Sequence, residues 1–256
     1  MKIADNLEML ELRMKVMGVE RIVYPTLMWD DDNVILVDAG IPSSLEMIKK
    51  QMEAAGASFA KINKIIATQQ DIDHIAGIKG ILNENPEVMV LAHEADKPYI
   101  QGEKKVKRLN SKFMDRIKDL PEEERSRIVD MFENSSVKVN STLSDGEVLP
   151  FCGGITVIHT PGHTPGHICL YHHMSKTLIA GDAMNILDGQ LVGPNKDPMS
   201  EDEVNANDAI NSLKKFKDYD IVNMIIYHGG LFNDKPNEGI KEVIRYRKFF
   251  SYKRND

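Results

Sequence analysis

The feature that most constrains the fold of this chain is a short apolar run followed by an aspartate or a histidine, which occurs five times. The runs "VILV", "KIIAT", "ITVIHT", "LIAG" and "IIY" read as strands, and the continuously apolar ones are typical of a sheet that is covered on both faces. Loops at strand ends are where a rigid sheet presents chemical groups. The sequence therefore predicts a sheet-based fold with a site at its strand ends. The residues that follow the runs are Asp38, the cluster at 69–74, His163, Asp182 and His228.

Each of these residues has an ordinary explanation when it is taken alone. A single aspartate after a strand is usually a turn former or a cap, and a single loop histidine usually makes a structural hydrogen bond. Five recurrences in one chain favour a shared site instead. Carboxylates and imidazoles together are the ligands of divalent transition metals, so the set predicts a metal site.

Segments of helical periodicity alternate with the strands. Residues 94–135 are charged and helical, and we expect two helices broken near Pro121 in an insertion that packs over one end of the sheet. The whole pattern indicates one domain over residues 1–256, of the α+β class, with two mixed β-sheets inside and helices outside, a four-layer sandwich. Further helices are predicted for residues 42–56, 74–82, 200–216 and 235–250.

Composition narrows the class of protein. In 256 residues, 42% are hydrophobic and 28% charged, which is typical of a soluble globular domain. The net charge of −7, without an evident basic face, argues against nucleic acid as a partner, and no apolar run has the length of a membrane span. The first residues do not resemble a signal peptide, and two cysteines, Cys152 and Cys169, fit a reducing compartment. We therefore expect a cytoplasmic protein that acts on a small-molecule substrate, with a homodimer left open as its assembly.

The order of the five polar positions resembles that of the five motifs of the metallo-β-lactamase superfamily. The segments "TPGHTPGH" and "AGD" carry the resemblance most specifically, and it extends from about residue 20 to residue 230. It implies an αββα sandwich with one or two metal ions at the sheet edges. Most members of this superfamily are hydrolases of esters, lactones, thioesters, amides or phosphoesters.

The second motif of the family, His-x-His-x-Asp-His, is altered in this chain. Gln69 and Asp71 stand where two histidines are usual, while Asp73 and His74 match. The resemblance implies that Asp73, His74 and His228 hold one cation, with Asp182 as a bridging ligand. That set is a complete first shell for Zn²⁺, Fe²⁺ or Mn²⁺.

The second cation site implied by the resemblance is poorer in nitrogen. It would contain Asp71, His163 and the Asp182 bridge, with the Gln69 carbonyl as an additional candidate. Oxygen ligands in place of two imidazoles favour Mn²⁺ or Fe²⁺ relative to zinc. A carboxylate at the second position is also similar to the iron-binding flavodiiron proteins of the same superfamily.

Three interpretations of this alteration stay open. Both cations bind, with lower affinity on the Gln69 side; or only the site of Asp73, His74 and His228 is filled, with Asp71 acting as a general base; or metal chemistry is lost. The function that we expect is that of a metal-dependent hydrolase. An iron-dependent oxidoreductase of the same fold and a catalytically silent sensor or scaffold are the alternatives.

The resemblance also implies roles for further residues. Asp73 would align the attacking hydroxide, and Asp71 would accept a proton where it holds no metal. Asp38 would orient metal-site histidines, and His167 would contact substrate or donate a hydrogen bond to a metal ligand. Tyr99, in the insertion, and Asn195, in the loop after Asp182, are candidate pocket residues.

Overall fold

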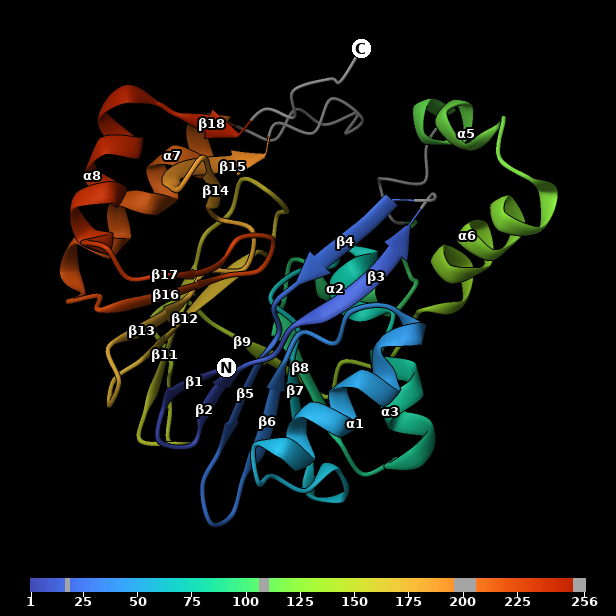
Figure 1. The fold of residues 1–256 in the computed structure, drawn as a ribbon, viewed down its shortest axis with the longest axis horizontal. Coiled ribbons are helices and arrows are strands. Elements are labelled where there is room, and N and C mark those ends of the chain that lie inside the picture. The colour runs from blue at the N-terminus through green and yellow to red at the C-terminus, as the bar shows by residue number, and fades with distance from the viewer. Residues whose placement is uncertain (17–18, 106–110, 196–205, 251–256) are drawn as a thin grey trace.

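Two mixed β-sheets lie face to face and carry helices on their outer faces, which confirms the predicted four-layer αββα sandwich (Figure 1). This computed structural model describes residues 1–16, 19–105, 111–195 and 206–250. Among the described helices, none combines the length and apolar character needed to cross a membrane.

The first sheet brings three site-bearing strand ends to one edge. Its strands β6 to β9 run parallel to one another, while β1, β2 and β5 are antiparallel. Because parallel strands end at the same edge, the residues after β6, β7 and β8 are neighbours. In sheet order the strands are β1 (Lys2–Ala4), β2 (Leu7–Met9), β5 (Thr26–Trp29), β6 (Val34–Val37), β7 (Lys64–Ile66), β8 (Met89–His93) and β9 (Ser141–Leu143).

The second sheet supplies the other half of the site. It is antiparallel except where β13 pairs in parallel with β16, so the loops that follow these two strands lie together. In sheet order the strands are β10 (Val148–Leu149), β11 (Ile155–His159), β12 (Ile168–His172), β13 (Thr177–Ile179), β16 (Asn223–Ile226) and β17 (Gly230–Phe232).

The core consists of three apolar layers, and this explains the continuous hydrophobicity of the central strands. Leu36 of β6 packs toward the helices, whereas its neighbours Ile35 and Val37 pack toward the second sheet. Burial on both faces removes the polar alternation that a half-exposed strand would show. The covering helices are α1 (Leu45–Ala54) and α3 (Ile78–Glu84) on the first sheet, and α7 (Ala206–Leu213) and α8 (Pro236–Tyr246) on the second.

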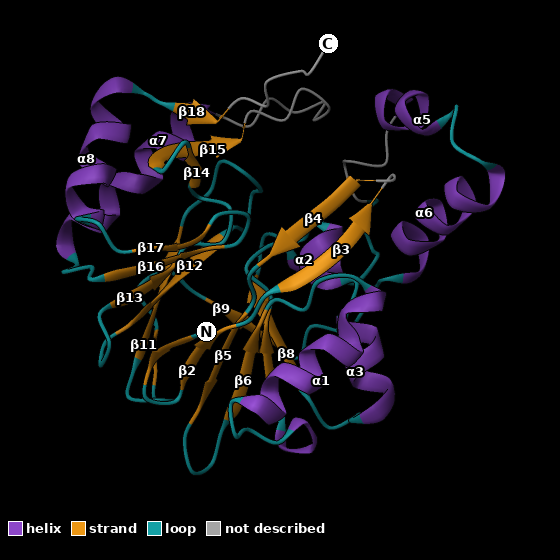
Figure 2. Cartoon of the chain, in the orientation of Figure 1, coloured by secondary structure: helices purple, strands orange, loops and turns teal. Residues whose placement is uncertain are grey.

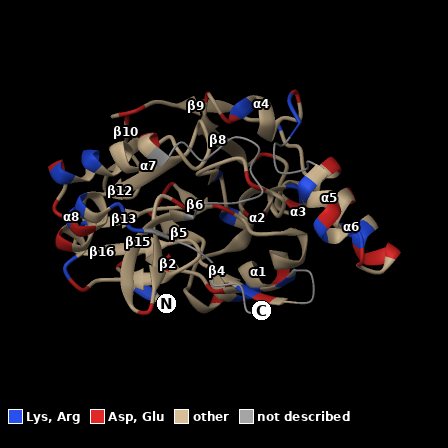
Figure 3. Cartoon of the chain, turned by 90° about the horizontal axis from the view of Figure 1, so that it is seen from above, with Lys and Arg blue, Asp and Glu red and all other residues tan. Residues whose placement is uncertain are grey.

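The insertion predicted for residues 94–135 contains short helices that project from the sandwich (Figure 1). The chain is broken at Pro121, which precedes the first turn of α6 and cannot continue a helix. Phe132 of α6 packs on Ile72 and Ala76, next to the site loop. Blue and red segments lie side by side on these helices in Figure 3, as on a solvated helix face. Their bounds are α4 (Lys97–Ile100), α5 (Ser111–Ile117) and α6 (Glu122–Asn134).

Figure 2 shows a hairpin of β3 and β4 that stands apart from the two main sheets. Pro25 separates it from β5. The remaining elements are β3 (Leu12–Val16), β4 (Val19–Val23), β14 (Asn185–Leu187), β15 (Gln190–Asn195), β18 (Phe249–Phe250), α2 (Ile72–Ile75) and the 3₁₀ turns at Pro42–Ser44, Phe59–Lys61 and Lys214–Asp218.

Two predicted helices differ from those observed. The segment 74–82 is divided between α2 and α3 next to Gly77, whose backbone passes so close to Ala39 that a Cβ there would lie 2.1 Å from its carbonyl oxygen. The last helix ends at Tyr246, where Arg247 turns to a positive φ of 49°. Of the helix predicted from residue 200, residues 200–205 lie outside the described ranges.

Candidate metal centre

Asp38 lies directly after β6 and accepts three hydrogen bonds in the interior. Its carboxylate receives the Thr68 N–H and hydroxyl at 2.8 and 2.7 Å, and its Oδ2 lies 2.8 Å from His74 Nδ1. A carboxylate can only accept here, so His74 Nδ1 carries a proton and donates it to Asp38, while Nε2 faces the site. Although burial opposes the charged form, Asp38 and Asp182 raise the pKa of His74 above its usual value. Asp38 has a φ of 60°, in the left-handed region, which sharply redirects the chain after the strand. The contact predicted between Asp38 and a site histidine is therefore present.

Asp73 and His74 belong to α2, a single helical turn that begins after Asp71. Tyr227 supports this turn from the second sheet. Its hydroxyl donates to the Asp73 carbonyl oxygen at 2.5 Å, and its ring stacks on His74 with 3.8 Å between ring centroids. Sequence reasoning missed Tyr227; its place at the end of an apolar run, next to His228, was the available signal.

The Asp182 carboxylate contacts histidine side chains from the loops of both sheets. Its Oδ2 lies 3.2 Å from His163 Nε2, 3.3 Å from His74 Nε2 and 3.4 Å from His228 Nε2. Its other carboxylate oxygen, Oδ1, is buried and has no hydrogen-bond partner among the described residues. Three imidazole nitrogens thus surround one carboxylate oxygen, and all four atoms are potential ligands of a metal cation.

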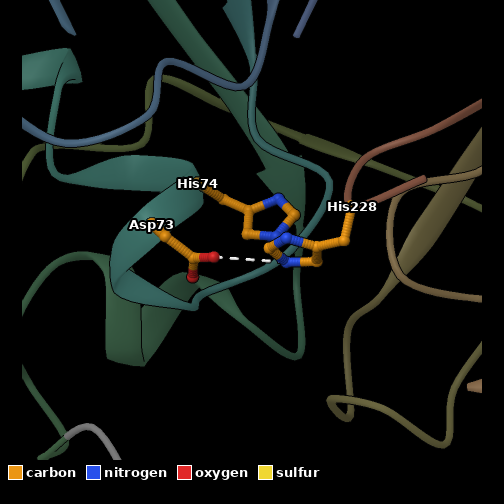
Figure 4. A group of neighbouring side chains, drawn as sticks. All are labelled: Asp73, His74 and His228. Carbon is orange, nitrogen blue, oxygen red and sulfur yellow. Dashed lines mark ion pairs between the residues drawn. The ribbon is translucent and has the colours of Figure 1, made fainter. Parts of the chain in front are cut away.

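Two overlapping groups of potential metal ligands result. Asp73, His74 and His228 form one, with a distance of 3.2 Å between Asp73 Oδ2 and His228 Nε2 (Figure 4). Asp71, His163 and Asp182 form the other, with His163 Nε2 3.0 Å from Asp71 Oδ2. Within each group the ligand atoms lie within 4.8 Å of one another. The structure thus brings together the same residues that the motif order grouped.

The first group opens toward solvent on one side. The side chains of Asp73 and His228 are 24% and 26% exposed, whereas that of His74 is 0% exposed. The group is therefore reached by solvent at Asp73 and His228, whereas His74 lies on its buried side.

The carboxylates and imidazoles of the site shift one another's pKa values. Burial opposes the charged form of each histidine, but Asp182 with Asp71 raises the pKa of His163 to about 9, and Asp182 with Asp73 raises the pKa of His228 to about 10. Burial likewise opposes ionisation of Asp73, yet His228 and His74 hold its pKa below the ordinary value. The neighbouring histidines likewise hold the pKa of Asp182 well below its usual value, so Asp73 and Asp182 stay ionised at neutral pH. Nitrogen and oxygen donors of this kind suit Zn²⁺, Mn²⁺ or Fe²⁺.

Gln69 lies inside this centre and is completely buried. Its Nε2 is 2.8 Å from His74 Nε2 and 2.9 Å from Asp182 Oδ2. Its carbonyl oxygen, the atom that the sequence suggested as a ligand, has no hydrogen-bond partner among the described residues. The amide nitrogen, not the oxygen, is turned toward the candidate ligands.

His167 supports Asp182 from behind. The backbone N–H of Asp182 donates to His167 Nε2 at 2.9 Å, while His167 Nδ1 lies 2.7 Å from the Thr160 hydroxyl. Burial, with the charge of His163, lowers the pKa of His167 to about 3, so this ring is neutral. His167 thus contacts a candidate ligand as an acceptor from its backbone, and not as the hydrogen-bond donor that the resemblance implied.

Asp96 joins the two loops that carry the second group, and sequence reasoning missed it. Its carboxylate accepts from Gln70 N at 3.0 Å, Thr164 Oγ1 at 2.7 Å and Gly166 N at 2.7 Å. Burial outweighs these hydrogen bonds and raises the pKa of Asp96 to about 6. Asp96 comes three residues after β8, so extending the strand-end rule to this strand would have found it.

The predicted pocket residues are less defined. Tyr99 is half-buried in α4, with Lys104 Nζ 5.5 Å from the centre of its ring. Asn195 ends β15, and its side chain lies outside the described part of the structure.

Comparison with curated proteins finds metallo-hydrolases among the relatives. The probable metallo-hydrolase YflN of Bacillus subtilis is 29% identical over 170 residues, which cover 65% of this chain and 61% of YflN. The uncharacterized protein YobT of the same organism is 25% identical over 227 residues, or 87% of this chain and 89% of YobT. A hydroxyacylglutathione hydrolase of Francisella philomiragia is 24% identical over 63% of this chain and 47% of its own length.

Solved structures share the fold. A metallo-beta-lactamase family protein of Thermus thermophilus, TTHA1429, has a TM-score of 0.70 at 23% identity, covering 96% of this chain and 80% of the other. A Cronobacter sakazakii metallo-beta-lactamase described by its HARLDQ motif has a TM-score of 0.62 at 18% identity, covering 96% and 82%. The family model of the metallo-beta-lactamase superfamily matches residues 18–224, most of the sequence. This chain belongs to the metallo-β-lactamase superfamily.

Proposed function

We propose that this protein is a metal-dependent hydrolase that cleaves an ester, lactone, thioester or related bond of a small-molecule substrate. The observation that supports this most is the convergence of three imidazole nitrogens within 3.4 Å of the Asp182 carboxylate oxygen. Relatives named as probable metallo-hydrolases favour hydrolysis as the reaction class.

The residues fit one or two divalent cations. Asp73, His74 and His228 would hold the first and Asp71 and His163 the second, with Asp182 shared. When bound, such a cation supplies a coordinated water whose pKa falls from about 15.7 towards 7, and it polarises the bond to be cleaved. The oxygen-rich second group favours Mn²⁺ or Fe²⁺ over Zn²⁺ there.

The protein's own groups position the reactants. Asp73 is the more exposed carboxylate of the first group, so its oxygen can accept a hydrogen bond from the attacking water and orient it. Asp71 is buried on the His163 side and would take up a proton where no cation is held. Tyr227 and Asp38 hold Asp73 and His74 in place during the reaction.

Reconstitution tests this proposal. Protein purified without added metal is analysed for its elements, stripped with a chelator, and loaded separately with Zn²⁺, Mn²⁺ or Fe²⁺. Each form is assayed on lactones, aryl esters, acylglutathiones and phosphodiesters; the acylglutathiones are included because of the Francisella relative's name. We expect hydrolysis of at least one substrate that disappears on stripping and returns with a cation.

Two outcomes would contradict hydrolysis. Failure to retain any of the three cations would favour a silent scaffold. Oxygen consumption by the iron-loaded protein, without hydrolysis of any substrate in the set, would favour the oxidoreductase alternative.

A further inference from the structure

Asp96 stands at the start of α4, yet its side chain does not cap this helix. An aspartate at this position usually accepts a hydrogen bond from the first turn of its own helix. In α4, all of whose residues are described, that bond is missing, although the Asp96 carbonyl oxygen accepts the N–H groups of Tyr99 and Ile100 at 3.0 and 3.1 Å. Asp96 is completely buried, so its carboxylate must find its partners elsewhere in the interior.

Those partners lie on the two loops that carry the second group of potential ligands. On the loop after β7 the carboxylate accepts the Gln70 N–H at 3.0 Å, and Gln70 immediately precedes Asp71. On the loop after β11 it accepts the Thr164 hydroxyl and the Gly166 N–H, both at 2.7 Å, and Thr164 immediately follows His163. One side chain therefore fixes the neighbours of two candidate ligands.

The two segments approach so closely that position 166 has no room for a side chain. A Cβ on Gly166 would lie 2.5 Å from the Asp96 backbone nitrogen and 2.7 Å from its Cγ. The ligand atoms that these loops carry, Asp71 Oδ2 and His163 Nε2, are 3.0 Å apart. Ligand geometry tolerates displacements of only about 0.5 Å, so a small shift of either loop would spoil this pair.

The first group is supported by different residues. Asp38 Oδ2 lies 2.8 Å from His74 Nδ1. The Tyr227 hydroxyl donates to the Asp73 carbonyl oxygen at 2.5 Å. Neither contact involves the loop after β11, so the geometry of the two groups can be disturbed one at a time.

We propose that Asp96 is a positioning residue for the second cation: it sets the affinity of the second group and leaves that of the first group unchanged. It acts through the loops of Asp71 and His163 and does not bind the cation itself. This inference rests on the proposed function, because it takes both groups as cation sites.

Asp96→Asn tests the inference by calorimetry. Asparagine keeps the size of the side chain, but its amide nitrogen cannot accept an N–H, so at least one bond to the loops is lost. Titration of the metal-free wild type with Mn²⁺ should show two binding steps. In the variant the dissociation constant of one step should rise roughly tenfold to hundredfold while the other stays the same. Equal changes in both steps, or no change in either, would overturn the inference.

Two further measurements identify the step that changes. Two Mn²⁺ ions that share a carboxylate are magnetically coupled, and their electron paramagnetic resonance spectrum differs from that of an isolated ion. At a free Mn²⁺ concentration that gives the coupled spectrum in the wild type, Asp96→Asn should show an isolated ion. In crystals soaked at that concentration, the anomalous peak at Asp71 and His163 should be lost and the peak at His74 and His228 retained. The reverse pattern would contradict the inference.

Two variants on the loop after β11 disturb the same contact without altering Asp96. Gly166→Ala places a methyl group against the Asp96 backbone and should weaken the same Mn²⁺ step. Thr164→Val removes one hydroxyl donor at nearly constant volume and should weaken that step less. These variants keep the test decisive if Asp96→Asn does not fold. Wild-type dissociation constants for both steps in both variants would overturn the inference.

Asp30→Asn is the matched control. The Asp30 carboxylate also accepts backbone N–H groups from two segments, Cys152 at 2.7 Å and Asn33 at 2.8 Å, but it lies at the opposite end of β6 from Asp38. Its substitution should leave both Mn²⁺ steps unchanged. A selective loss equal to that of Asp96→Asn would show a general effect of losing such a carboxylate and would overturn the inference.

The number of ions bound by the wild type separates this inference from the proposed function. A wild type that binds a single Mn²⁺ ion would overturn the role of Asp96 and leave a hydrolase with one cation. A wild type that binds neither Mn²⁺ nor Zn²⁺ would overturn the proposed function itself.

Discussion

Asp182 Oδ2 lies 3.3 Å from His74 Nε2, although 108 residues separate them in the chain and their strands belong to different sheets. The pair exists because the loops after β7 and β13 open at the same end of the sandwich. His228, after the neighbouring strand β16, reaches the same carboxylate oxygen. Any cation held here depends on both sheets at once.

Removing either the shared ligand Asp182 or His228 of the first group should therefore abolish metal-dependent turnover. We expect Asp182→Ala and His228→Ala to lose more activity than the roughly tenfold to hundredfold typical of residues that only support ligands. Metal content and turnover are measured together. His173→Ala is the control, since His173 contacts the Thr156 hydroxyl away from the site. Well-folded variants with wild-type turnover would refute the assignment of both ligands.

Asp38 should tune metal affinity without binding the metal. Asp38→Asn keeps a residue that tolerates the positive φ, but replaces the anion that holds His74, so we expect metal affinity to fall by about tenfold. Asp38→Ala should be worse, because alanine also strains this backbone. Competition with a chromogenic chelator measures both. Equal affinity in the wild type and Asp38→Ala would mean that the pair has no role in metal binding.

Tyr227 should contribute to stability through two separable contacts. Tyr227→Phe removes the hydrogen bond to the Asp73 carbonyl and should cost about 1 kcal/mol of unfolding free energy. Tyr227→Ala also removes the ring stacked on His74, and should cost roughly 3–5 kcal/mol in all. Denaturant unfolding compares the two. If Tyr227→Phe were as unstable as Tyr227→Ala, the stacking would contribute nothing.

The pH dependence of stability should contain a contribution from Asp96. Burial raises the pKa of Asp96 from the usual 3.8 to about 6 in the folded protein, so the folded state favours the protonated form. The contribution is therefore fully present below about pH 4 and is lost as the pH rises through 6, in total about 3 kcal/mol.

Asp96→Asn isolates this contribution, because asparagine does not titrate. The unfolding free energy of the wild type minus that of Asp96→Asn, both metal-free, should decrease between pH 4.5 and pH 7.5. Denaturant titrations at the two pH values measure it. A difference that is constant or grows with pH would contradict the burial argument for Asp96.

Much of this architecture could be predicted because burial on both faces leaves a direct mark on the sequence. The runs before Asp38 and Asp182 are apolar throughout, and the polar residue that ends each run marks the sheet edge. The break between α2 and α3 could not be predicted in this way. It arises where Gly77 approaches Ala39, a contact between segments that are distant in sequence.

The residues that support the candidate ligands could not be predicted from the sequence for a similar reason. Asp96 and Tyr227 resemble an ordinary loop aspartate and a core tyrosine until the fold places them against Gly166 and His74. Likewise, the Gln69 amide nitrogen contacts His74 and Asp182, which lie on loops from different sheets. Sequence order indicates which side chains meet, whereas hydrogen-bond direction depends on the packed structure.

The most direct test of the metal centre is anomalous diffraction from crystals of protein loaded with Mn²⁺ or Zn²⁺, recorded on both sides of the metal's absorption edge. The account predicts a peak bonded to His74, His228 and Asp73, in contact with Asp182. Peaks confined to other parts of the molecule, or none at saturating metal, would contradict it.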